Sequence, residues 1–222
     1  MKKLTSHKVY QALKEHILAG TFVAGEKLST ERIAKIINVS HTPVREALRM
    51  VAREGLVELK ANRGAYVRAL NHDEAIEIYK IRRVLDGLAA FEMAQNASAS
   101  EAVKHLFDCC RQYKEAQTEA ENEKVDYEFH TTIFNSSGMR FLSGLATDYL
   151  VLSKTFGPSR MLLVDIRGDD WRERAYQEHI QIALAIEHGL ADVARELAMR
   201  HTDFVLNLLC NKNNAGKSAS AV

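Results

Sequence analysis

The sequence predicts a mainly α-helical protein. An N-terminal winged helix-turn-helix domain is expected in residues 1–70, and an all-α antiparallel bundle of six to seven helices in residues 71–211. Apolar residues recur every three or four positions along most of the chain, which is the period of an α-helix. The period shortens to two only within residues 56–68, which is typical of a β-hairpin. Only 2 Pro and 11 Gly interrupt 222 residues, so long helices with few turns are expected.

Charge divides the chain at the same place. Residues 1–70 hold 13 Lys and Arg against 6 Asp and Glu, a formal charge of +7. The remainder holds 17 against 23, a formal charge of −6, so the net charge of +1 hides a basic head on an acidic body. Such a head favours a polyanion such as double-stranded DNA as its partner, although basic residues also cluster by chance on solvated surfaces.

Cysteine usage and hydropathy indicate the cellular compartment in which the protein is expected. Three cysteines, two of them adjacent at Cys109 and Cys110, provide neither a disulfide framework nor a Cys-x-x-Cys metal pattern. The adjacent pair is most simply explained by packing, with a zinc or redox role as the alternative. No apolar run approaches the roughly 18 residues of a membrane span, and no signal peptide follows Met1. We therefore expect a cytoplasmic protein with no membrane partner.

Three helices are expected in the basic head, at residues 6–20, 30–37 and 40–53. Ser29 precedes the second and Ser40 precedes the third, each as an N-cap whose hydroxyl accepts a backbone N–H of the first turn. Pro43 suits the first turn of the third helix, because its fixed φ is helical and its missing N–H has no intrahelical partner there.

The third helix and the hairpin that follows it form the expected DNA-reading surface. Thr42, Arg45 and Arg49 share the polar face of this helix, and a face of hydroxyls and arginines suits a DNA major groove. The hairpin turn carries Arg63 and Gly64 at a basic tip. Three helices followed by a hairpin predict a winged helix-turn-helix, with the third helix as reader and the hairpin as wing.

The bundle pattern predicts only helices. Their expected ranges are 73–95, 101–119, 124–136, 141–156, 169–188 and 191–209, with an additional short turn near 162–167. Residues 212–222 are small and polar, and they are expected to form a disordered tail.

Four residues of the bundle are expected to meet. Asp126 and His130 are four positions apart, so they lie on one helical face. His179 and His201 lie in the apolar stripes of the last two helices, 10 residues before and 12 residues after the turn at Gly189. At about 1.5 Å per residue, both lie roughly 15–18 Å from that turn and can sit side by side.

These four side chains favour a divalent transition metal, with zinc as the first expectation and nickel or another ion as alternatives. A single inward histidine is more often a hydrogen-bonded core residue. Three inward histidines at matching depth, together with an aspartate, favour a metal site instead. Four protein ligands leave two positions of an octahedral ion open, and a small carboxylic acid can fill them.

Three motifs stand out in the N-terminal part: Leu28-Ser29-Thr30-Glu31-Arg32, then Val39-Ser40-His41-Thr42-Pro43-Val44-Arg45-Glu46-Ala47-Leu48, then Gly55-Leu56-Val57 with Arg63-Gly64. In these motifs the N-terminal part resembles the GntR family of bacterial transcription regulators. Four motifs stand out in the bundle: Arg82-Arg83-Val84-Leu85-Asp86, Asp126-Tyr127-Glu128-Phe129-His130, Glu178-His179-Ile180 and Met199-Arg200-His201. In these the bundle resembles the FCD effector domain of the FadR subfamily.

The resemblance implies DNA contacts for Arg32, Thr42 and Arg45, with His41 and Gly64 also near the DNA. His41 stands where the family usually has arginine. An imidazole offers fewer donors to a guanine than a guanidinium does, so a different base preference is expected at that operator position.

The FCD resemblance also implies a metal at the Asp-x-x-x-His, His and His pattern. For Arg82 two interpretations remain open: an i,i+4 ion pair with Asp86, or a contact to the carboxylate of an effector. We therefore expect a bacterial homodimeric regulator, such as a repressor, that binds an inverted-repeat operator on the nucleoid and responds to a small organic acid. A metal-dependent enzyme fused to a DNA-binding head, and a direct metal sensor, are the alternatives.

Overall fold

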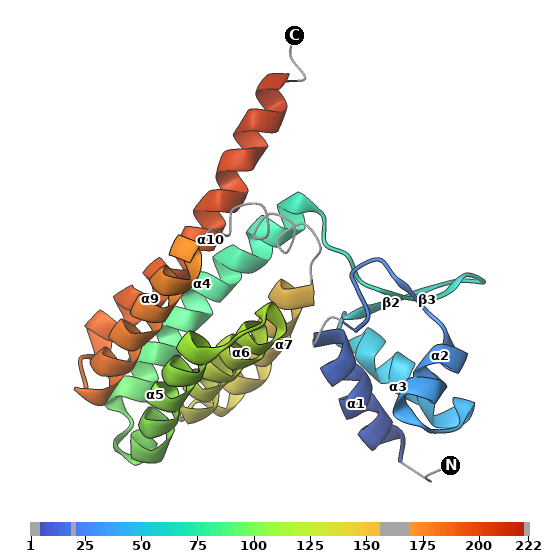
Figure 1. Cartoon of the computed structure of the whole chain (residues 1–222), viewed down its shortest axis with the longest axis horizontal. Helices are drawn as coiled ribbons and strands as arrows, with labels where there is room; N and C mark the ends of the chain where they lie inside the picture. The colour runs from blue at the N-terminus through green and yellow to red at the C-terminus, as the bar shows by residue number, and fades with distance from the viewer. Residues whose placement is uncertain (1–4, 19–20, 156–168, 220–222) are drawn as a thin grey trace.

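The structure is a computed structural model that describes residues 5–18, 21–155 and 169–219. Figure 1 shows a helical bundle beside a smaller N-terminal part, joined by the chain that leaves strand β3 and enters helix α4. The chain is mainly helical with one small antiparallel sheet, so the predicted fold class is confirmed. In the described residues, no helix is both long and apolar enough to cross a membrane.

The N-terminal part is a three-helix unit with a winged sheet. Its helices are α1 (Ser6–Leu18), α2 (Thr30–Ile37) and α3 (His41–Arg53). Its strands are β1 (Lys27–Leu28), β2 (Val57–Lys60) and β3 (Gly64–Val67), paired antiparallel in the order β1-β3-β2. The three helices and the hairpin were predicted. The two-residue strand β1 was not, because two residues cannot display a period.

The N-caps of the two helix-turn-helix elements differ. The hydroxyl of Ser29 accepts the backbone N–H of Arg32, as expected for the start of α2. Ser40 has the extended backbone of an N-cap, but its side chain makes no capping hydrogen bond. The prediction for the Ser40 hydroxyl was therefore wrong. Pro43 occupies the third helical position and has no N–H, so one of the two usual donors to a capping hydroxyl is missing.

Apolar faces hold this N-terminal unit together. Leu13 of α1, Ile33 of α2 and Val44 of α3 are fully buried in one core. At the wing tip Asn62 and Gly64 both have positive φ, 58° and 99°, which Asn and Gly adopt more readily than other residues. The turn thus forms without the glycine that would be the simplest choice at position 62.

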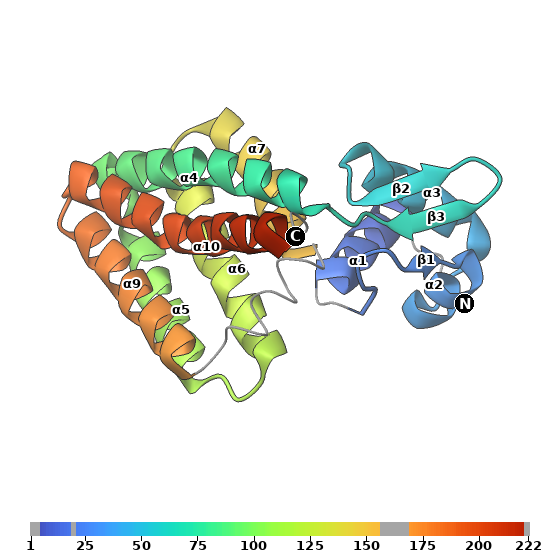
Figure 2. The same cartoon turned by 90° about the horizontal axis from the view of Figure 1, so that it is seen from above.

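Six α-helices and one 3₁₀ turn make up the described part of the bundle. They are α4 (His72–Gln95), η1 (Ala97–Ala99), α5 (Ser100–Glu115), α6 (Glu119–Ser136), α7 (Arg140–Thr155), α9 (Asp169–Glu187) and α10 (Ala191–Ala219). Figures 1 and 2 both show α4 and α10 side by side along most of α4. The short turn expected near 162–167 lies outside the described residues.

Two boundaries differ from expectation at the α5–α6 connection. Helix α5 ends at Glu115, and α6 already begins at Glu119, five residues before the expected start. A reciprocal pair of hydrogen bonds fixes this start: Thr118 accepts the N–H of Glu121, and Glu121 accepts the N–H of Thr118.

The C-terminal boundary also differs. Helix α10 continues through Ala219, whereas the sequence was expected to form a disordered tail from residue 212. No proline follows residue 211, so nothing in the sequence removes a backbone donor from the extending helix. In Figure 1 the end of α10 projects beyond the other helices of the bundle.

Helices α4 and α10 approach each other closely at Gly87. A Cβ at this position would lie 2.6 Å from Cγ of Met199 and 3.3 Å from Cγ of Arg195. The absence of a side chain on α4 therefore lets α10 pack against its backbone.

Candidate metal centre and nucleic-acid interface

Four side chains from three helices converge inside the bundle. Asp126 and His130 come from α6, His179 from α9 and His201 from α10. One ligand atom from each lies within 4.8 Å of the corresponding atom of every other member. The predicted convergence is thus observed, and we call these residues the four-residue cluster.

The cluster is largely withdrawn from solvent. The side chains of His179 and His130 are 1% and 6% exposed, that of His201 11% and that of Asp126 27%. Oδ1 of Asp126 lies 3.5 Å from Nε2 of His179 and 3.8 Å from Nε2 of His130. One carboxylate oxygen therefore faces two imidazole nitrogens, and its partial exposure marks the more open side of the cluster.

Aromatic neighbours fix the orientation of His179. The ring of Phe129 stacks on the imidazole with a centroid separation of 4.3 Å, and Tyr113 meets it edge-on at 5.3 Å. These contacts restrict ring rotation, because any large change in the imidazole plane would displace buried side chains. The ring position is thus set by packing before anything binds.

Burial controls the protonation of His130. Desolvation holds the pKa of this imidazole well below its ordinary 6.5, although the negative charge of Asp126 opposes the effect. The cationic Arg82 lowers the pKa further. His130 is therefore neutral at physiological pH, and a neutral imidazole has a lone pair for a metal ion.

A carboxylate outside the cluster orients His201. Its Nδ1 lies 2.7 Å from Oε2 of Glu178, and Glu178 also accepts a hydrogen bond from Nε of Arg174 at 2.9 Å. Burial favours the protonated Glu178, but its bonds to His201 and Arg174 prevail and lower its pKa. An ionised carboxylate only accepts, so Nδ1 carries a proton, and Nε2 is the nitrogen left to bind a metal ion.

The donor set fits a divalent transition ion. Three nitrogens and one oxygen are the ligands that zinc and its neighbours in the first transition row prefer. Ions of this class bind such ligands at about 2.0–2.2 Å, which places neighbouring ligand atoms roughly 3–3.5 Å apart. The separations of 3.5 and 3.8 Å in the cluster need only small side-chain shifts to reach that spacing.

Arg82 lies in a buried polar network close to the cluster. Its guanidinium donates to Oγ of Ser153 at 2.9 Å and to Oδ2 of Asp86 at 3.3 Å. Thr202 donates to the same oxygen of Asp86 at 2.7 Å. The ion pair with Asp86, one of the two interpretations of Arg82, is therefore present.

This network is not saturated. Nε of Arg82 and Oδ1 of Asp86 are buried without a hydrogen-bond partner among the residues that the structure describes. Burial favours the neutral guanidine, yet Asp86, Tyr79 and Asp126 outweigh it and raise the pKa of Arg82. A buried cation with an unused donor thus lies within electrostatic reach of the cluster.

The predicted DNA-reading residues all lie at the surface of the N-terminal unit. On α3, His41, Thr42, Arg45 and Arg49 are exposed, while Val44, Ala47, Leu48 and Val51 of the opposite face are buried. Arg63 and Gly64 are exposed at the wing tip. The structure therefore places a continuous set of polar side chains along α3 and another at the end of the wing.

Arg32 is placed differently from the residues of α3. Its side chain is 48% exposed and pairs with Glu26, and its guanidinium lies over the ring of Phe22 with 5.0 Å to the centroid. It also donates to the carbonyl of Thr21. These contacts hold Arg32 near the N-terminus of α2 in a defined orientation.

Residues 5–67 match the family of bacterial regulatory proteins called gntR, and residues 77–204 match the FCD domain. The chain belongs to the GntR family. Its described bundle is an FCD domain, and the resemblance to the FadR subfamily is confirmed. Because the family consists of transcriptional regulators, the alternative of a metal-dependent enzyme is set aside.

Similar proteins extend over nearly the whole chain of this GntR-family regulator. It is 26% identical over 198 residues to an uncharacterized HTH-type transcriptional regulator, YdhC, of Bacillus subtilis (strain 168), covering 86% of this chain and 85% of the relative. It is 26% identical over 227 residues to a probable D-xylose utilization operon transcriptional repressor of Paenarthrobacter nicotinovorans, covering 98% and 96%. The solved structure of E. coli McbR/YncC has a TM-score of 0.80 at 19% identity, covering 94% and 98%, which shows a shared fold.

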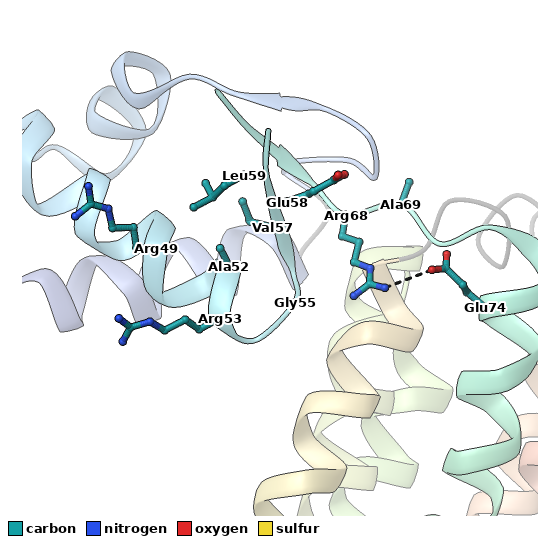
Figure 3. A pocket seen from close by; sticks show the side chains of 10 residues that line it. All are labelled: Arg49, Ala52, Arg53, Gly55, Val57, Glu58, Leu59, Arg68, Ala69 and Glu74. Atoms are coloured by element: carbon teal, nitrogen blue, oxygen red, sulfur yellow. Dashed lines mark hydrogen bonds and ion pairs between the residues drawn. The ribbon is translucent and has the colours of Figure 1, made fainter. Parts of the chain in front are cut away.

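A pocket of about 800 Å³ lies where the two parts of this GntR-family protein meet. Figure 3 shows Arg49 and Arg53 of α3, strand β2, and Arg68 with Glu74 around it. Nη2 of Arg68, just after the wing, lies 3.4 Å from Oε1 of Glu74 in the first turn of α4. This ion pair crosses the junction between wing and bundle.

Sequence reasoning missed Glu178 and the Arg68–Glu74 pair. Glu178 was noted only as a neighbour of His179, although its i,i+4 spacing from Arg174 was visible. That it lies beside His201, 23 residues away, depends on how α9 and α10 are rotated about their axes, and residue spacing alone does not determine this rotation.

Proposed function

We propose that this GntR-family protein is a ligand-responsive transcriptional repressor with a resident metal ion. Residues 1–70 would bind operator DNA, and residues 71–211 would bind the metal and a small organic acid. The observation that carries this proposal is the buried four-residue cluster, in a chain whose α3 exposes a hydroxyl and arginine face. The relative from Paenarthrobacter nicotinovorans, called a repressor, supports the sign of the regulation.

In the proposed complex, α3 enters the major groove and the wing lies along the phosphates. Thr42, Arg45 and His41 would read bases, with Arg45 able to bind a guanine through two hydrogen bonds. Arg32, Arg49, Arg63 and the backbone of Gly64 would contact phosphates or the groove edge. The exposure of every one of these positions supports this division of roles.

Asp126, His130, His179 and His201 would hold the metal ion. The neutral state of His130 and the orientation of His201 by Glu178 support this assignment, because a metal-binding imidazole needs a free lone pair. Zinc is our first choice, since the donor set contains three imidazoles and one carboxylate. A bound ion would supply a Lewis-acidic anchor for the carboxylate of an effector.

The proposed effector is a small carboxylic acid that also reaches Arg82. The unused Nε–H of Arg82 and the electrostatic effects that link Arg82 with Asp126 and His130 support its place beside the metal. An incoming carboxylate would accept that hydrogen bond in a buried setting, where charge-assisted bonds are strong. Metal and arginine together would select an anion that carries oxygen donors.

A homodimer would place two α3 helices on an inverted repeat. Self-association is supported by large apolar side chains left exposed on two bundle helices that pack together: Val84 on α4 is 59% exposed, and Phe141 and Leu145 on α7 are 87% and 55% exposed. The dimer would adopt two arrangements that differ in their affinity for DNA. Acid binding would favour one of them. A coupling of about 1–3 kcal/mol is typical for such regulation.

The proposal is tested with the purified full chain and DNA from its own promoter region. Elemental analysis should find at least one zinc or similar ion for each chain. Fluorescence anisotropy should show DNA binding that weakens steeply with salt and changes by about 5- to 150-fold with one member of a carboxylic acid panel. Asp126→Asn should retain DNA binding and lose the acid response, whereas Arg45→Ala should weaken DNA binding by about 1–3 kcal/mol.

Three results would contradict it. Salt-independent or absent binding to promoter DNA removes the regulator role. DNA binding that follows free zinc without any acid indicates a metal sensor. An unchanged acid response in Asp126→Asn places the effector away from the four-residue cluster.

A further inference from the structure

A second group of metal-binding side chains lies between α5 and α6. His105 and Cys109 are four residues apart on α5, and Glu128 faces them from α6. Nε2 of His105 lies 2.9 Å from Oε1 of Glu128 and 3.8 Å from Sγ of Cys109. One ligand atom from each residue lies within 4.8 Å of the other two. We call these residues the thiol cluster.

The separations suit tetrahedral coordination. Zinc binds sulfur at about 2.3 Å and nitrogen at about 2.0–2.1 Å, so the two donors of a tetrahedral site lie roughly 3.5 Å apart. The observed 3.8 Å between sulfur and nitrogen is close to this value. The shorter contact of 2.9 Å between His105 and Glu128 would lengthen as an ion inserts between the two atoms.

The thiol cluster is open on one side. The side chains of His105 and Glu128 are 42% and 41% exposed, while Cys109 is 1% exposed. An ion can therefore enter from solvent and keep a water molecule as its fourth ligand. The sulfur lies at the closed end of the site, where an ion loses part of its hydration and gains a strong ligand.

We propose that His105, Cys109 and Glu128 bind a second divalent ion of the zinc class, independently of the four-residue cluster. Glu128 lies two positions after Asp126 on α6, so the two side chains leave the helix in different directions. The second ion would connect α5 to α6 near the outside of the bundle. It would respond to the supply of thiol-binding metal in the cell rather than to the organic acid.

Metal binding requires the thiol of Cys109 to lose its proton. Burial, together with Glu128 and Asp108, raises the pKa of Cys109 to about 12, so the metal-free thiol is protonated. Binding exchanges this proton for the ion: the S–H bond breaks, a sulfur–metal bond forms, and the proton leaves to solvent. Part of the binding free energy is spent on this exchange, so we expect weaker zinc binding than at the four-residue cluster.

Cobalt titration tests the proposal, because Co²⁺ bound to a thiolate has a charge-transfer absorption that imidazole and carboxylate ligands do not give. The four-residue cluster contains no sulfur, so this absorption reports only on a cysteine. The full chain is stripped of metal with a chelator, dialysed and titrated with Co²⁺ under reducing conditions. We expect the absorption to appear in the unmodified chain and to disappear when Zn²⁺ is added in excess.

Matched variants assign the signal. Cys109→Ser should abolish the absorption, while Cys110→Ser, the neighbouring buried cysteine, and Cys210→Ser should retain it. Glu128→Gln changes a half-exposed residue and is not expected to disturb folding. It should raise the Co²⁺ concentration at half-saturation by at least tenfold and leave the far-ultraviolet circular dichroism unchanged.

The proposal fails if the unmodified chain gives no thiolate absorption, if Cys109→Ser retains it, or if Glu128→Gln binds Co²⁺ as tightly as the unmodified chain. None of these results bears on the four-residue cluster. That cluster is measured separately by loss of the spectroscopically distinct second cobalt site in Asp126→Asn.

Discussion

Glu178 determines which nitrogen of His201 is available to a metal ion in the four-residue cluster. Without this carboxylate, neutral His201 has no fixed tautomer and either nitrogen can carry the proton. The additional bond from Arg174 holds Glu178 in place, so an exposed arginine on α9 contributes to the geometry of a buried site. Metal-binding histidines generally depend on such a partner.

Replacing Glu178 with glutamine should therefore weaken zinc binding by about 10- to 100-fold, the usual effect of losing the carboxylate that orients a metal ligand. Competition with a chromophoric chelator measures the change. Glu173→Gln on the same helix is the control, because Glu173 is exposed and accepts only from Gln177 among the contacts that the structure gives it. Equal affinity in Glu178→Gln and the control would mean that His201 is oriented by packing alone.

At the DNA-binding surface, Arg45 and His41 are expected to behave differently when replaced. Arg45→Ala should cost about 1–3 kcal/mol of operator binding, the value of a good two-bond contact to a base. His41→Arg should retain binding but change the preferred base at one operator position. Anisotropy with a panel of singly substituted operators distinguishes the two. A uniform change across the panel for His41→Arg would indicate a phosphate contact instead.

The convergence of Asp126, His130, His179 and His201 could be predicted in large part. Helical periodicity gives the face of each residue, and the distance from Gly189 gives the matching depth of His179 and His201. The partners of Arg82 could only be predicted in part. Its bond to Asp86 follows from the i,i+4 spacing, but its bond to Ser153 spans 71 residues and depends on how α7 packs against α4.

At the scale of elements, the close packing of α4 against α10 depends on one glycine. Gly87→Ala should destabilise the bundle by up to about 2 kcal/mol, since overpacking costs about 1–3 kcal/mol and the better helix propensity of alanine returns up to about 1. Gly144→Ala on α7 is the control, because a Cβ there meets no atom within 4 Å. That variant should be more stable by about 0.5–1 kcal/mol. Urea denaturation compares the two, and equal stabilisation would mean that Met199 moves aside freely.

The start of α6 predicts a pH effect. The backbone N–H groups of Gln117 and Thr118 donate to the carboxylate of Glu121 and lower its pKa below the ordinary 4.5. The hydroxyl of Thr118 makes a smaller contribution in the same direction. A carboxyl group with a depressed folded-state pKa stabilises the native state at pH values above its unfolded-state pKa. This contribution is lost as the pH falls through the folded-state pKa. Carbon-detected NMR titration should give a midpoint below 4.5 for Glu121, and Thr118→Ala should raise it. A midpoint at the ordinary value would mean that the cap is not formed in solution.

Helix existence was easier to predict than helix orientation. Helical spacing predicts an inward apolar stripe of Ile78, Ile81, Leu85 and Leu88 on α4, but these are half-buried, and the deepest positions include Tyr79, Arg82 and Asp86. The prediction failed because α4 is surrounded on several sides and buries small and polar residues as well. On α7, Leu145 belongs to the apolar repeat of the helix and is nevertheless 55% exposed.

At the scale of the molecule, the described residues form two large apolar cores and a small third cluster of Ala75, Tyr79 and Leu209. Val9 to Val67 supply the N-terminal core and Ala89 to Ala198 the larger bundle core, while the half-buried Tyr127 packs against both. The four-residue cluster lies among residues of the bundle core. Metal binding is therefore expected to act on the stability of the bundle more than on that of the N-terminal unit.

Removing the metal should lower the melting temperature of the bundle. An ion present at 100 times its dissociation constant stabilises the folded state by about 2.7 kcal/mol. Calorimetry of the zinc-loaded and chelator-treated chain measures the shift, and Asp126→Asn, which retains a side chain of nearly the same size, should show little or none. A shift of equal size in Asp126→Asn would place the stabilising ion elsewhere.

Glu74 takes part in two structures at once. One carboxylate oxygen caps the first turn of α4 by accepting the N–H of Asn71, and the other pairs with Arg68 at the end of the wing. Fraying of that first turn would release the arginine, and withdrawal of the arginine would free the carboxylate to leave the turn. The ion pair therefore links the order of this helical turn to the position of the wing. In the proposed mechanism, a ligand in the bundle would change DNA binding by changing how often that turn is formed.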